Sequence, residues 1–371
     1  MPFIFAKGGF DLSVYMKRAM ELAKKGFGFV NPNPLVGAVI VKDNKVIGEG
    51  YHTSYGNLHA EREAIKSLAE SAEGADMYVT LEPCCHYGKN PPCTEAIIEN
   101  KIKRVYVGSY DPNPLVAGKG IEILRDAGIE VIDGYMRKEC DEINPIFFHY
   151  ITTNEPYVIM KTAVTADGKT ACANGDSKWI TNEQSRENVH FTRKRCMAIL
   201  TGVGTVIADD PMLNCRCENP KNPIRVICDS NLRIPLSSQI VKTAGKIPTI
   251  VANISDDEEK IKALQNAGVE IIKTAKDNGR VNLKELISLL GKRKIDSVMV
   301  EAGATINAAM LNSGKVNELH LYIAPKLIGG MDSIPFLGGK SPLKMADAHR
   351  LSSPEISTFG DDIMISYKVG E

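Results

Sequence analysis

The chain carries two short segments near its start, LHAE at residues 58–61 and LEPCCHYGKNPPC at residues 81–93. Together they supply His59, Cys84 and Cys93, one imidazole and two thiols of the kind that zinc prefers. Three protein ligands leave one tetrahedral position open, where water can bind and have its pKa lowered towards neutrality. The two segments therefore predict a catalytic metal site with these three residues as ligands.

Glu61 lies two residues after the histidine and is the natural candidate for moving protons at this site. Side chains two apart on a helix point in different directions, so His59 and Glu61 can meet at one metal only if His59 precedes the regular helix. The strongly helix-forming run at residues 60–69 agrees with that placement. Pro91 and Pro92 similarly place Cys93 at the start of a second helix, where the helix dipole favours a thiolate.

A His-x-Glu followed by Pro-Cys and a later Cys is typical of zinc deaminases that act on nucleobase-like rings. Two alternatives stay open at this level. Cys85 or His86 could complete a closed, structural zinc site, or the cysteines could be small buried residues that bind no metal.

Length and composition limit the number of domains and the kinds of partner that the chain can have. A length of 371 residues favours two domains. Lys plus Arg and Asp plus Glu both number 45, and this balance counts against a nucleic-acid partner. No apolar run approaches the length of a membrane span, and residues 1–7 lack a charged region ahead of an apolar one. Nine irregularly spaced cysteines suit reduced thiols, so we expect a cytoplasmic protein without a membrane partner.

Residues 11–150 alternate between helical and strand patterns. A helix is expected at 11–25, a hairpin at 36–52 with its turn at Asp43-Asn44, strands at 77–81, 105–109 and 130–132, and helices from Thr94 and Gly120. Ligands of such sheets lie at strand ends, which is where the metal residues fall. The turns at 31–34 (NPNP) and 111–114 (DPNP) are either ordinary turns or the rim of the metal pocket.

A second α/β domain is expected from residue 151 to 371. Its predicted strands are 157–163, 198–201, 224–229, 249–252, 270–272, 297–301 and 318–324. The glycine-containing loops at 201–205 and 301–305 each follow a strand and lead into a helix, where amides can approach a phosphate. Neither loop matches the full dinucleotide fingerprint, so they indicate only a plausible nucleotide site. The Cys215-Arg216-Cys217 triplet is interpreted as packing.

The ordered set of motifs resembles the bifunctional deaminase/reductases of bacterial riboflavin biosynthesis over nearly the whole length. The marks in the first half are NPNP at 31–34, GYH at 50–52, HAE at 59–61, TLEPC at 80–84, PPC at 91–93 and DPNP at 111–114; in the second they are Lys161, DG at 167–168, WIT at 179–181, ADDP at 208–211, DS at 229–230, VEAG at 300–303 and APK at 324–326.

The resemblance implies a cytidine-deaminase-like three-layer α/β/α domain at residues 1–150 and a dihydrofolate-reductase-like α/β domain at 151–371. The first would remove the ring amino group of 2,5-diamino-6-ribosylamino-4(3H)-pyrimidinone 5′-phosphate with zinc. The second would reduce the ribosyl group to ribityl with NADPH, giving 5-amino-6-ribitylamino-uracil 5′-phosphate. The expected partners are these phosphorylated pyrimidines and further copies of the chain in a homo-oligomer.

The same resemblance assigns roles to individual positions. His59, Cys84 and Cys93 match zinc ligands, Glu61 the proton shuttle and Lys161 a catalytic position. Substrate positions are Asn33, His52, His86, Lys89, Asp111, Asn113, Ser177, Arg193, Leu213, Arg216 and Glu301; cofactor positions are Ala163, Trp179, Thr205, Asp209, Ser230, Gly303, Ala304 and Thr305. Two departures are Asn90, where threonine is usual, and Cys85, beside a ligand.

The main rival is a nucleic-acid editing zinc deaminase with a C-terminal binding domain. Those enzymes favour a Cys-x-x-Cys pair, whereas eight residues separate Cys84 from Cys93. A third reading, a zinc-stabilised binding module without catalysis, leaves Glu61 unexplained.

Overall fold

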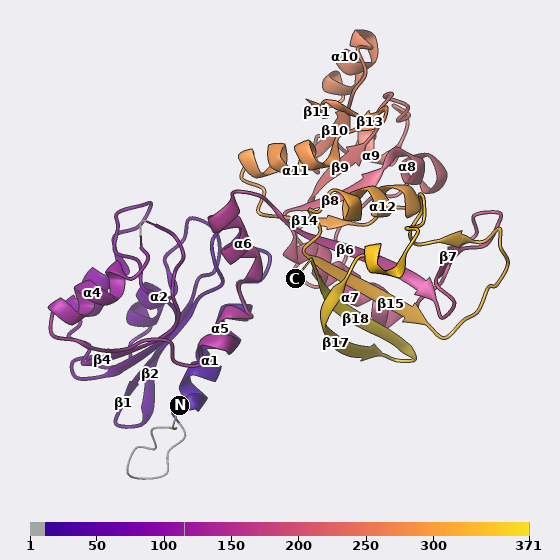
Figure 1. The fold of residues 1–371 in the computed structure, drawn as a ribbon. Coiled ribbons are helices and arrows are strands. Elements are labelled where there is room, and N and C mark those ends of the chain that lie inside the picture. The colour runs from indigo at the N-terminus through magenta and orange to yellow at the C-terminus, as the bar shows by residue number, and fades with distance from the viewer. Residues whose placement is uncertain (1–11, 115, 371) are drawn as a thin grey trace. The chain divides into compact units, whose positions relative to one another are not determined.

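The computed structural model describes residues 12–114 and 116–370, and the chain divides into two compact units after Thr153. The first unit has a five-stranded sheet in the order β2-β1-β3-β4-β5 (Figure 1). Its strands are β1 (Gly37–Lys42), β2 (Lys45–Tyr51), β3 (Asp76–Leu81), β4 (Arg104–Ser109) and β5 (Glu130–Ile132); its helices are α1 (Ser13–Lys24), α2 (Ala60–Lys66), α3 (Cys93–Glu99), α4 (Lys119–Asp126), α5 (Arg137–Asp141) and α6 (Pro145–Thr153).

Strand β1 pairs antiparallel with both β2 and β3, whereas β3, β4 and β5 run parallel. Alternate strand residues face opposite sides of a sheet, and both faces here are apolar. Ala38, Met77 and Val105 pack with α2, α3 and α4, while Val39 and Tyr78 pack with α1 and α5. The unit therefore has the three α/β/α layers that the sequence predicted.

Helix α2 lies very close to the sheet because of a glycine. A Cβ at Gly50 on β2 would lie 2.2 Å from the backbone nitrogen of Ala64 on α2, closer than real Cβ contacts. This contact lets the helix that begins at residue 60 settle against β2, and so sets the position of the preceding His59.

The second unit contains a nine-stranded sheet in the order β11-β10-β9-β8-β14-β6-β15-β18-β17. The strands from β11 to β15 in that order are parallel, and β18 and β17 complete the sheet antiparallel. Their bounds are β6 (Tyr157–Thr165), β8 (Ala198–Gly202), β9 (Ile224–Cys228), β10 (Thr249–Asn253), β11 (Glu270–Lys273), β14 (Ser297–Val300), β15 (Glu318–Ala324), β17 (Leu351–Phe359) and β18 (Asp362–Val369).

Helices cover both faces of this sheet (Figure 1). Residues of α11 and α12 pack on one apolar face, and residues of α8, α9 and α10 pack on the other. The helices are α7 (Glu183–Arg195), α8 (Val203–Asp209), α9 (Gln239–Lys242), α10 (Glu258–Asn266), α11 (Leu283–Lys292) and α12 (Ala304–Asn312), with a 3-10 turn at Met345–Asp347. Two short ribbons pair β12 (Lys276–Asp277) with β13 (Arg280–Val281), and β7 (Lys169–Ala171) with β16 (Ile334–Pro335).

The parallel strands and the β1–β2 hairpin lie where the sequence predicted them, to within one or two residues at most ends. The expected first helix began at Asp11, which lies outside the described residues. Residues 1–7, which lack a charged region ahead of an apolar one, also lie outside them. Strands β17 and β18, and the short strands of the two ribbons, were not predicted from the sequence. None of the helices in the described ranges is long and apolar enough to span a bilayer.

Candidate functional site

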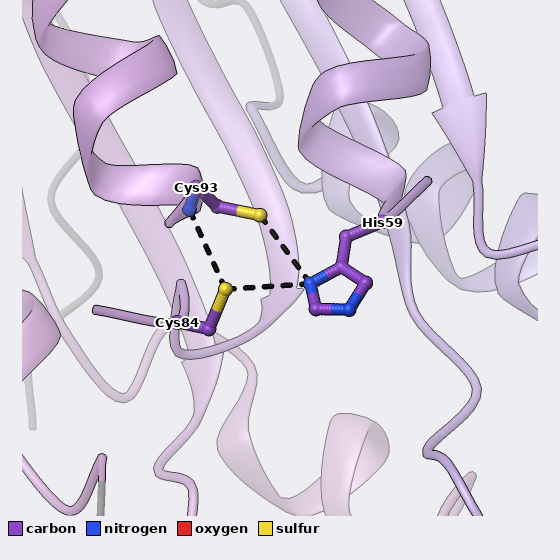
Figure 2. Close-up of side chains that lie close together, drawn as sticks. All are labelled: His59, Cys84 and Cys93. Atoms are coloured by element: carbon purple, nitrogen blue, oxygen red, sulfur yellow. Dashed lines mark hydrogen bonds between the residues drawn. The ribbon is translucent and has the colours of Figure 1, made fainter. Parts of the chain in front are cut away.

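The three predicted metal ligands come from three different elements. His59 is the N-cap of α2, with extended backbone angles (φ −75°, ψ 163°), Cys84 follows β3, and Cys93 is the first residue of α3. His59 Nδ1 lies 3.3 Å from Cys84 Sγ and 3.5 Å from Cys93 Sγ (Figure 2). All three ligand atoms lie within 4.8 Å of one another. One nitrogen and two sulfurs at this spacing fit a zinc ion with an open fourth position.

A closed structural site would need a fourth protein ligand. In the part of the chain that the structure describes, no other His, Cys, Asp or Glu side chain joins this group. Cys85 and His86, the two residues considered for that role, are therefore not placed with the three ligand atoms. The geometry favours the open arrangement over the closed one.

The pKa values of the Cys84 and Cys93 thiols are shifted in opposite directions. The hydrogen bond with Cys93, together with His59, lowers the pKa of Cys84 to about 4. The same hydrogen bond and burial hold the pKa of Cys93 well above its ordinary value. These shifts arise from protein groups alone, so the expectation that the helix dipole favours a thiolate at Cys93 and helps metal binding stays a prediction. Two adjacent thiols share one proton, and a divalent cation is what favours both thiolates.

Glu61 is buried in the first turn of α2, next to the ligands. Burial, and then the negative charge of Cys84, raise its pKa to about 7. A carboxyl group with a pKa near the working pH can both accept and release a proton, which is what general acid–base catalysis requires.

A cavity of about 330 Å³ opens beside these residues within the first unit. Every candidate substrate residue of the first half lines it: Asn33, His52, His86, Lys89, Asp111 and Asn113. His59, Glu61 and Cys84 line it as well. Both Asx-Pro turns therefore lie in the wall of the pocket, which resolves the alternative left open by the sequence.

Hydrogen bonds fix the orientation of the His52 ring in this wall. Its Nδ1 lies 3.0 Å from the carbonyl oxygen of Leu58, and its Nε2 lies 3.1 Å from Asn33 Nδ2. Burial lowers the pKa of His52, so the ring is neutral at pH 7. A neutral ring that donates to the carbonyl through Nδ1 accepts at Nε2 from the Asn33 amide, which leaves the Asn33 oxygen available to a ligand.

Two charged residues that line the cavity, Lys89 and Asp111, differ in their exposure to solvent. Lys89 is exposed, and its Nζ lies 4.1 Å from the centroid of the Tyr55 ring. This cation–π contact orients the Lys89 ammonium group, which can bind a phosphate. Burial raises the pKa of Asp111 to about 6, although the Asn113 amide donates to its carboxylate. At the variant loop position, Asn90 Nδ2 donates to the carbonyl oxygen of Asn57 at 2.8 Å and so ties this loop to the turn before His59.

Sequence reasoning missed two contributions to this pocket. Phe147, Tyr150 and Ile151 of α6 line the cavity. The apolar run at residues 146–151 was a signal that this helix packs on the first unit. The other contribution is Glu82, a buried carboxylate that accepts from the amides of Gly118 and Gly120, each at 3.0 Å, and from that of Asp111 at 3.4 Å.

Replacing Glu82 with glutamine should lower both the stability of the first unit and the deamination activity that the sequence motifs predict. The amide can accept fewer of these backbone hydrogen bonds, so we expect a loss of about 1–3 kcal/mol in the free energy of unfolding. The Asp111–Asn113 turn should shift, which raises the KM for deamination and leaves reduction unchanged. Thermal unfolding and separate assays of the two reactions provide the measurement, with Glu99→Gln on exposed α3 surface as the control. An unchanged KM would show that Glu82 does not position this turn.

The candidate residues of the second unit include a compact charged cluster. Lys161 Nζ on β6 donates to Glu301 Oε1 at 2.8 Å, and Arg193 of α7 donates to Glu301 Oε2 from Nε at 3.0 Å and Nη2 at 2.8 Å. Burial alone would raise the pKa of Glu301, but the charges of Arg193 and Lys161 hold it well below its usual range. The structure thus holds two cations and one carboxylate beside the end of β14.

The two glycine-containing loops lie side by side at the carboxyl edge of the parallel sheet. Strands β8 and β14 are neighbours, and a Cβ at Gly202 would lie 2.7 Å from Ile306 Cδ1 of α12. The first turns of α8 and α12 therefore begin close together at this edge, where the amides of helix N-termini can meet a ligand. Two buried oxygens at the ends of the neighbouring strands β8 and β9, Thr201 Oγ1 and Asp229 Oδ1, have no hydrogen-bond partner among the described residues. Free amides and oxygens at strand ends suit a nucleotide cofactor such as NADPH.

The other candidates of this unit are distributed around the same strand ends. Ala163 lies on β6, Thr205 and Asp209 on α8, Ser230 two residues after β9, and Gly303, Ala304 and Thr305 at the start of α12. Leu213 and Arg216 lie in the segment after α8, where Asn214 accepts from both Arg193 and Arg216. Ser177 is half-buried in the loop before α7.

Trp179 presents an exposed ring, and the protein contacts both this ring and the main chain of the residue. Its side chain is 63% exposed, and the Arg186 guanidinium lies 4.6 Å from the centroid of the ring. Lys326 Nζ donates to its carbonyl oxygen at 2.6 Å. An ordered, exposed aromatic ring suits stacking against a planar ligand.

Two family models match different parts of this chain. Residues 11–109 match the cytidine and deoxycytidylate deaminase zinc-binding region, and residues 156–365 match the RibD C-terminal domain. The riboflavin biosynthesis protein RibD of Actinobacillus pleuropneumoniae is 50% identical over 355 residues, which cover 96% of this chain and 94% of that protein. The Escherichia coli K12 protein of the same name is 40% identical, over 95% of this chain and 97% of that protein.

Solved structures show the same similarity in three dimensions. Acinetobacter baumannii RibD, form 1, superposes with a TM-score of 0.87 at 38% identity and covers 96% of this chain and 98% of that one. The diaminohydroxyphosphoribosylaminopyrimidine deaminase/5-amino-6-(5-phosphoribosylamino)uracil reductase of Thermotoga maritima gives 0.84, also at 38% identity, with the same coverage.

Proposed function

Because the chain belongs to the RibD family of bifunctional riboflavin-biosynthesis enzymes, we propose that residues 1–150 carry its deaminase and residues 151–371 its reductase. The enzyme uses zinc to deaminate 2,5-diamino-6-ribosylamino-4(3H)-pyrimidinone 5′-phosphate and NADPH to reduce the ribosyl group of the product. The observation that carries the deaminase assignment is the convergence of His59, Cys84 and Cys93 beside a buried Glu61.

In the deamination we assign the proton transfers to Glu61. Zinc held by His59, Cys84 and Cys93 supplies a Lewis acid that lowers the pKa of water. The Glu61 carboxylate accepts one proton from the attacking water and delivers it to the ring nitrogen; it then accepts the second proton, from the hydroxyl now bound to the ring carbon, and delivers it to the amino group, which leaves as ammonia. Its pKa of about 7 supports both directions of transfer.

The remaining residues of the first cavity are assigned to binding. Asn33, Asp111 and Asn113 can hydrogen-bond the polar edge of the pyrimidine, and exposed Lys89 can bind the phosphate at the cavity mouth. His52 holds the Asn33 amide in a fixed orientation through the hydrogen bond described above.

In the reduction we assign Lys161 and Arg193 to the substrate's oxygens. NADPH supplies a hydride to the sugar carbon. The bond between that carbon and the ring oxygen breaks, and the Lys161 ammonium stabilises the charge on this oxygen as it takes up a proton. Glu301 holds both cations in place by its hydrogen bonds. Arg216 is exposed, and it donates a hydrogen bond to Asn214. We assign its guanidinium group to the substrate phosphate.

Replacing Asp209 with alanine should weaken reduction and leave deamination unchanged. Asp209 ends the helix that begins at the Gly202–Gly204 turn, and we assign it to the cofactor. Loss of a charged hydrogen-bonding group predicts a rise of about tenfold or more in the KM for NADPH. NADPH oxidation with supplied deaminated intermediate measures it, and Asp277→Ala on the exposed β12 ribbon is the control. If deamination fell as much as reduction in the folded variant, the two sites would be coupled and this assignment wrong.

The rival function as a nucleic-acid editing deaminase has less support. The chain carries equal numbers of basic and acidic residues, and the reductase match occupies the half where that reading places a binding domain. We therefore propose small phosphorylated pyrimidines as the substrates, and a cytoplasmic enzyme that does not bind nucleic acid.

We also propose that the enzyme is a homo-oligomer built through its reductase unit. Large apolar side chains are strongly exposed there: Leu327 (78%), Met331 (105%), Leu343 (98%), Met345 (88%) and Ile356 (68%). Ile356 lies on β17, the last strand of the sheet, whose free edge can pair with another copy. Apolar surface of this kind supports a protein interface.

A double charge substitution tests this interface. Leu343→Glu combined with Met345→Glu should convert the oligomer into a monomer in light scattering coupled to size-exclusion chromatography, because buried carboxylates without partners are costly. Val14→Glu, on an exposed position of α1 in the first unit, should leave the oligomer intact. A wild-type protein that elutes as a monomer would refute the proposal.

A further inference from the structure

The triplet Cys215-Arg216-Cys217 has an arrangement that packing alone does not explain. Cys215 Sγ and Cys217 Sγ lie 3.2 Å apart, and both thiols are reduced. Cys215 is buried, whereas Cys217 is half-buried and so within reach of small solutes. Two thiols in contact, one of them accessible, form a pair that can be joined with little movement of the chain.

This pair belongs to a segment tied to the reductase cluster. Cys215 Sγ also donates to the carbonyl oxygen of His190 on α7 at 3.3 Å, and His190 Nδ1 accepts from the Arg216 amide at 3.3 Å. The preceding Asn214 accepts from Arg193 through its carbonyl oxygen at 2.9 Å and from Arg216 through Oδ1 at 3.0 Å. A change in the position of the two sulfurs should therefore also shift Arg193 and Arg216, which we assign to substrate binding.

We propose that Cys215 and Cys217 form a thiol-oxidation site that a peroxide closes into an intrachain disulfide, and that this closure impairs reduction but not deamination. The second half of the proposal rests on the assigned reductase substrate site. The first half concerns the sulfurs alone and stands independently of it.

The chemistry balances with hydrogen peroxide as the oxidant. The accessible Cys217 sulfur, as thiolate, attacks one peroxide oxygen; the O–O bond breaks, and hydroxide leaves and takes up a proton to become water. The resulting sulfenic acid is attacked by the Cys215 sulfur; an S–S bond forms, the S–O bond breaks and a second water leaves. Two thiols lose two electrons and two protons, and one peroxide becomes two water molecules.

The environment sets how readily the reaction starts. Burial, and then the hydrogen bond with Cys215, raise the pKa of Cys217 to about 11. Little of it is thiolate at neutral pH, so the pair stays reduced until a peroxide is abundant. This behaviour differs from that of Cys84, whose sulfur is held by the metal site.

Closure changes the site through the main chain on both sides of Arg216. The sulfurs must approach from 3.2 Å to a bond of roughly 2 Å, and Cys215 loses the proton that it donates to His190. Arg216 and Asn214 should move with them, and Arg193 should lose one of its two acceptor residues, the Asn214 carbonyl, while it keeps Glu301. Misplacing a substrate-positioning group by about 1 Å can cost up to about 10²-fold in rate.

The test uses zinc-loaded full-length enzyme treated with hydrogen peroxide at mildly alkaline pH. Trypsin cleaves after Arg195, Arg216 and Lys221, so peptides 196–216 and 217–221 should remain joined until dithiothreitol is added. Fragmentation assigns the link to Cys215 or to Cys196. We expect the joined peptide to accompany a fall of about tenfold in NADPH oxidation with supplied intermediate, reversed by dithiothreitol, with ammonia release unchanged.

Two variants make the result specific. Cys217→Ser keeps a small polar side chain and should abolish both the joined peptide and the loss of reduction. Cys172→Ser, at a half-buried cysteine in the β7 loop region, should respond to peroxide as the wild type does. Absence of a Cys215–Cys217 link would refute the oxidation site itself. A link that forms fully without lowering reduction would refute its effect on the substrate site, and would leave the assignment of reductase activity untouched.

Discussion

Replacing Glu61 with glutamine should reduce the rate of deamination by about 10²–10⁴-fold, because the amide cannot accept a proton from the attacking water. The side chain is almost isosteric and sits in the first turn of α2, so the fold should be retained. The buried carboxyl has a pKa of about 7, and the substitution removes a group that is costly to ionise there. Stability should therefore stay the same or rise slightly.

Three measurements check this prediction: ammonia release from the diamino substrate, zinc content by atomic absorption, and reduction of supplied intermediate. Zinc content and reduction should match the wild type. Glu63→Gln, two positions along the same helix, is the matched control and should deaminate normally. A Glu61→Gln enzyme that deaminates near the wild-type rate would exclude Glu61 as the proton shuttle.

Replacing Cys84 or Cys93 with serine should remove the zinc and abolish deamination. A hydroxyl is a poor ligand for this ion, and two remaining protein ligands hold it too weakly. We expect about one zinc per chain in the wild type and nearly none in either variant. Reduction should persist, since every residue assigned to NADPH lies in the second unit.

Cys85→Ser is the decisive control for the ligand assignment. Cys85 adjoins Cys84 in the sequence, yet its side chain is not part of the group of ligand atoms. This variant should keep its zinc. Loss of zinc from Cys85→Ser, together with retention in Cys84→Ser, would require a different set of ligands.

The grouping of the three candidate metal ligands was predictable because these residues carry local signals. The His-x-Glu spacing required His59 to precede the helix, and the structure places it at the N-cap of α2. Pro91 and Pro92 marked the start of α3, and Cys93 is its first residue. The raised pKa of Cys93 was not predictable from the dipole alone, because it comes from a hydrogen bond with Cys84, a second thiol that the fold brings into contact, and from burial.

Features that depend on distant contacts were not predictable. Strand β17 is largely exposed and β18 is mostly half-buried, so neither has a continuous buried apolar run, and β18 joins the parallel strands through its pairing with β15. The wall supplied by Tyr150 and Ile151 was missed because α6 lies far along the chain from the metal residues and reaches the cavity only in the folded unit. The Lys161–Glu301–Arg193 cluster joins residues up to 140 positions apart.

The central claim is that one chain performs both reactions in sequence, deamination with zinc and then reduction with NADPH. The most direct test follows ammonia release and NADPH absorbance together after purified enzyme is given the diamino substrate. We predict ammonia release without NADPH, stopping at the deaminated ribosyl product, and oxidation of one NADPH for each ammonia when NADPH is present. Ammonia release that is never followed by NADPH oxidation, or NADPH oxidation that precedes ammonia release, would contradict it.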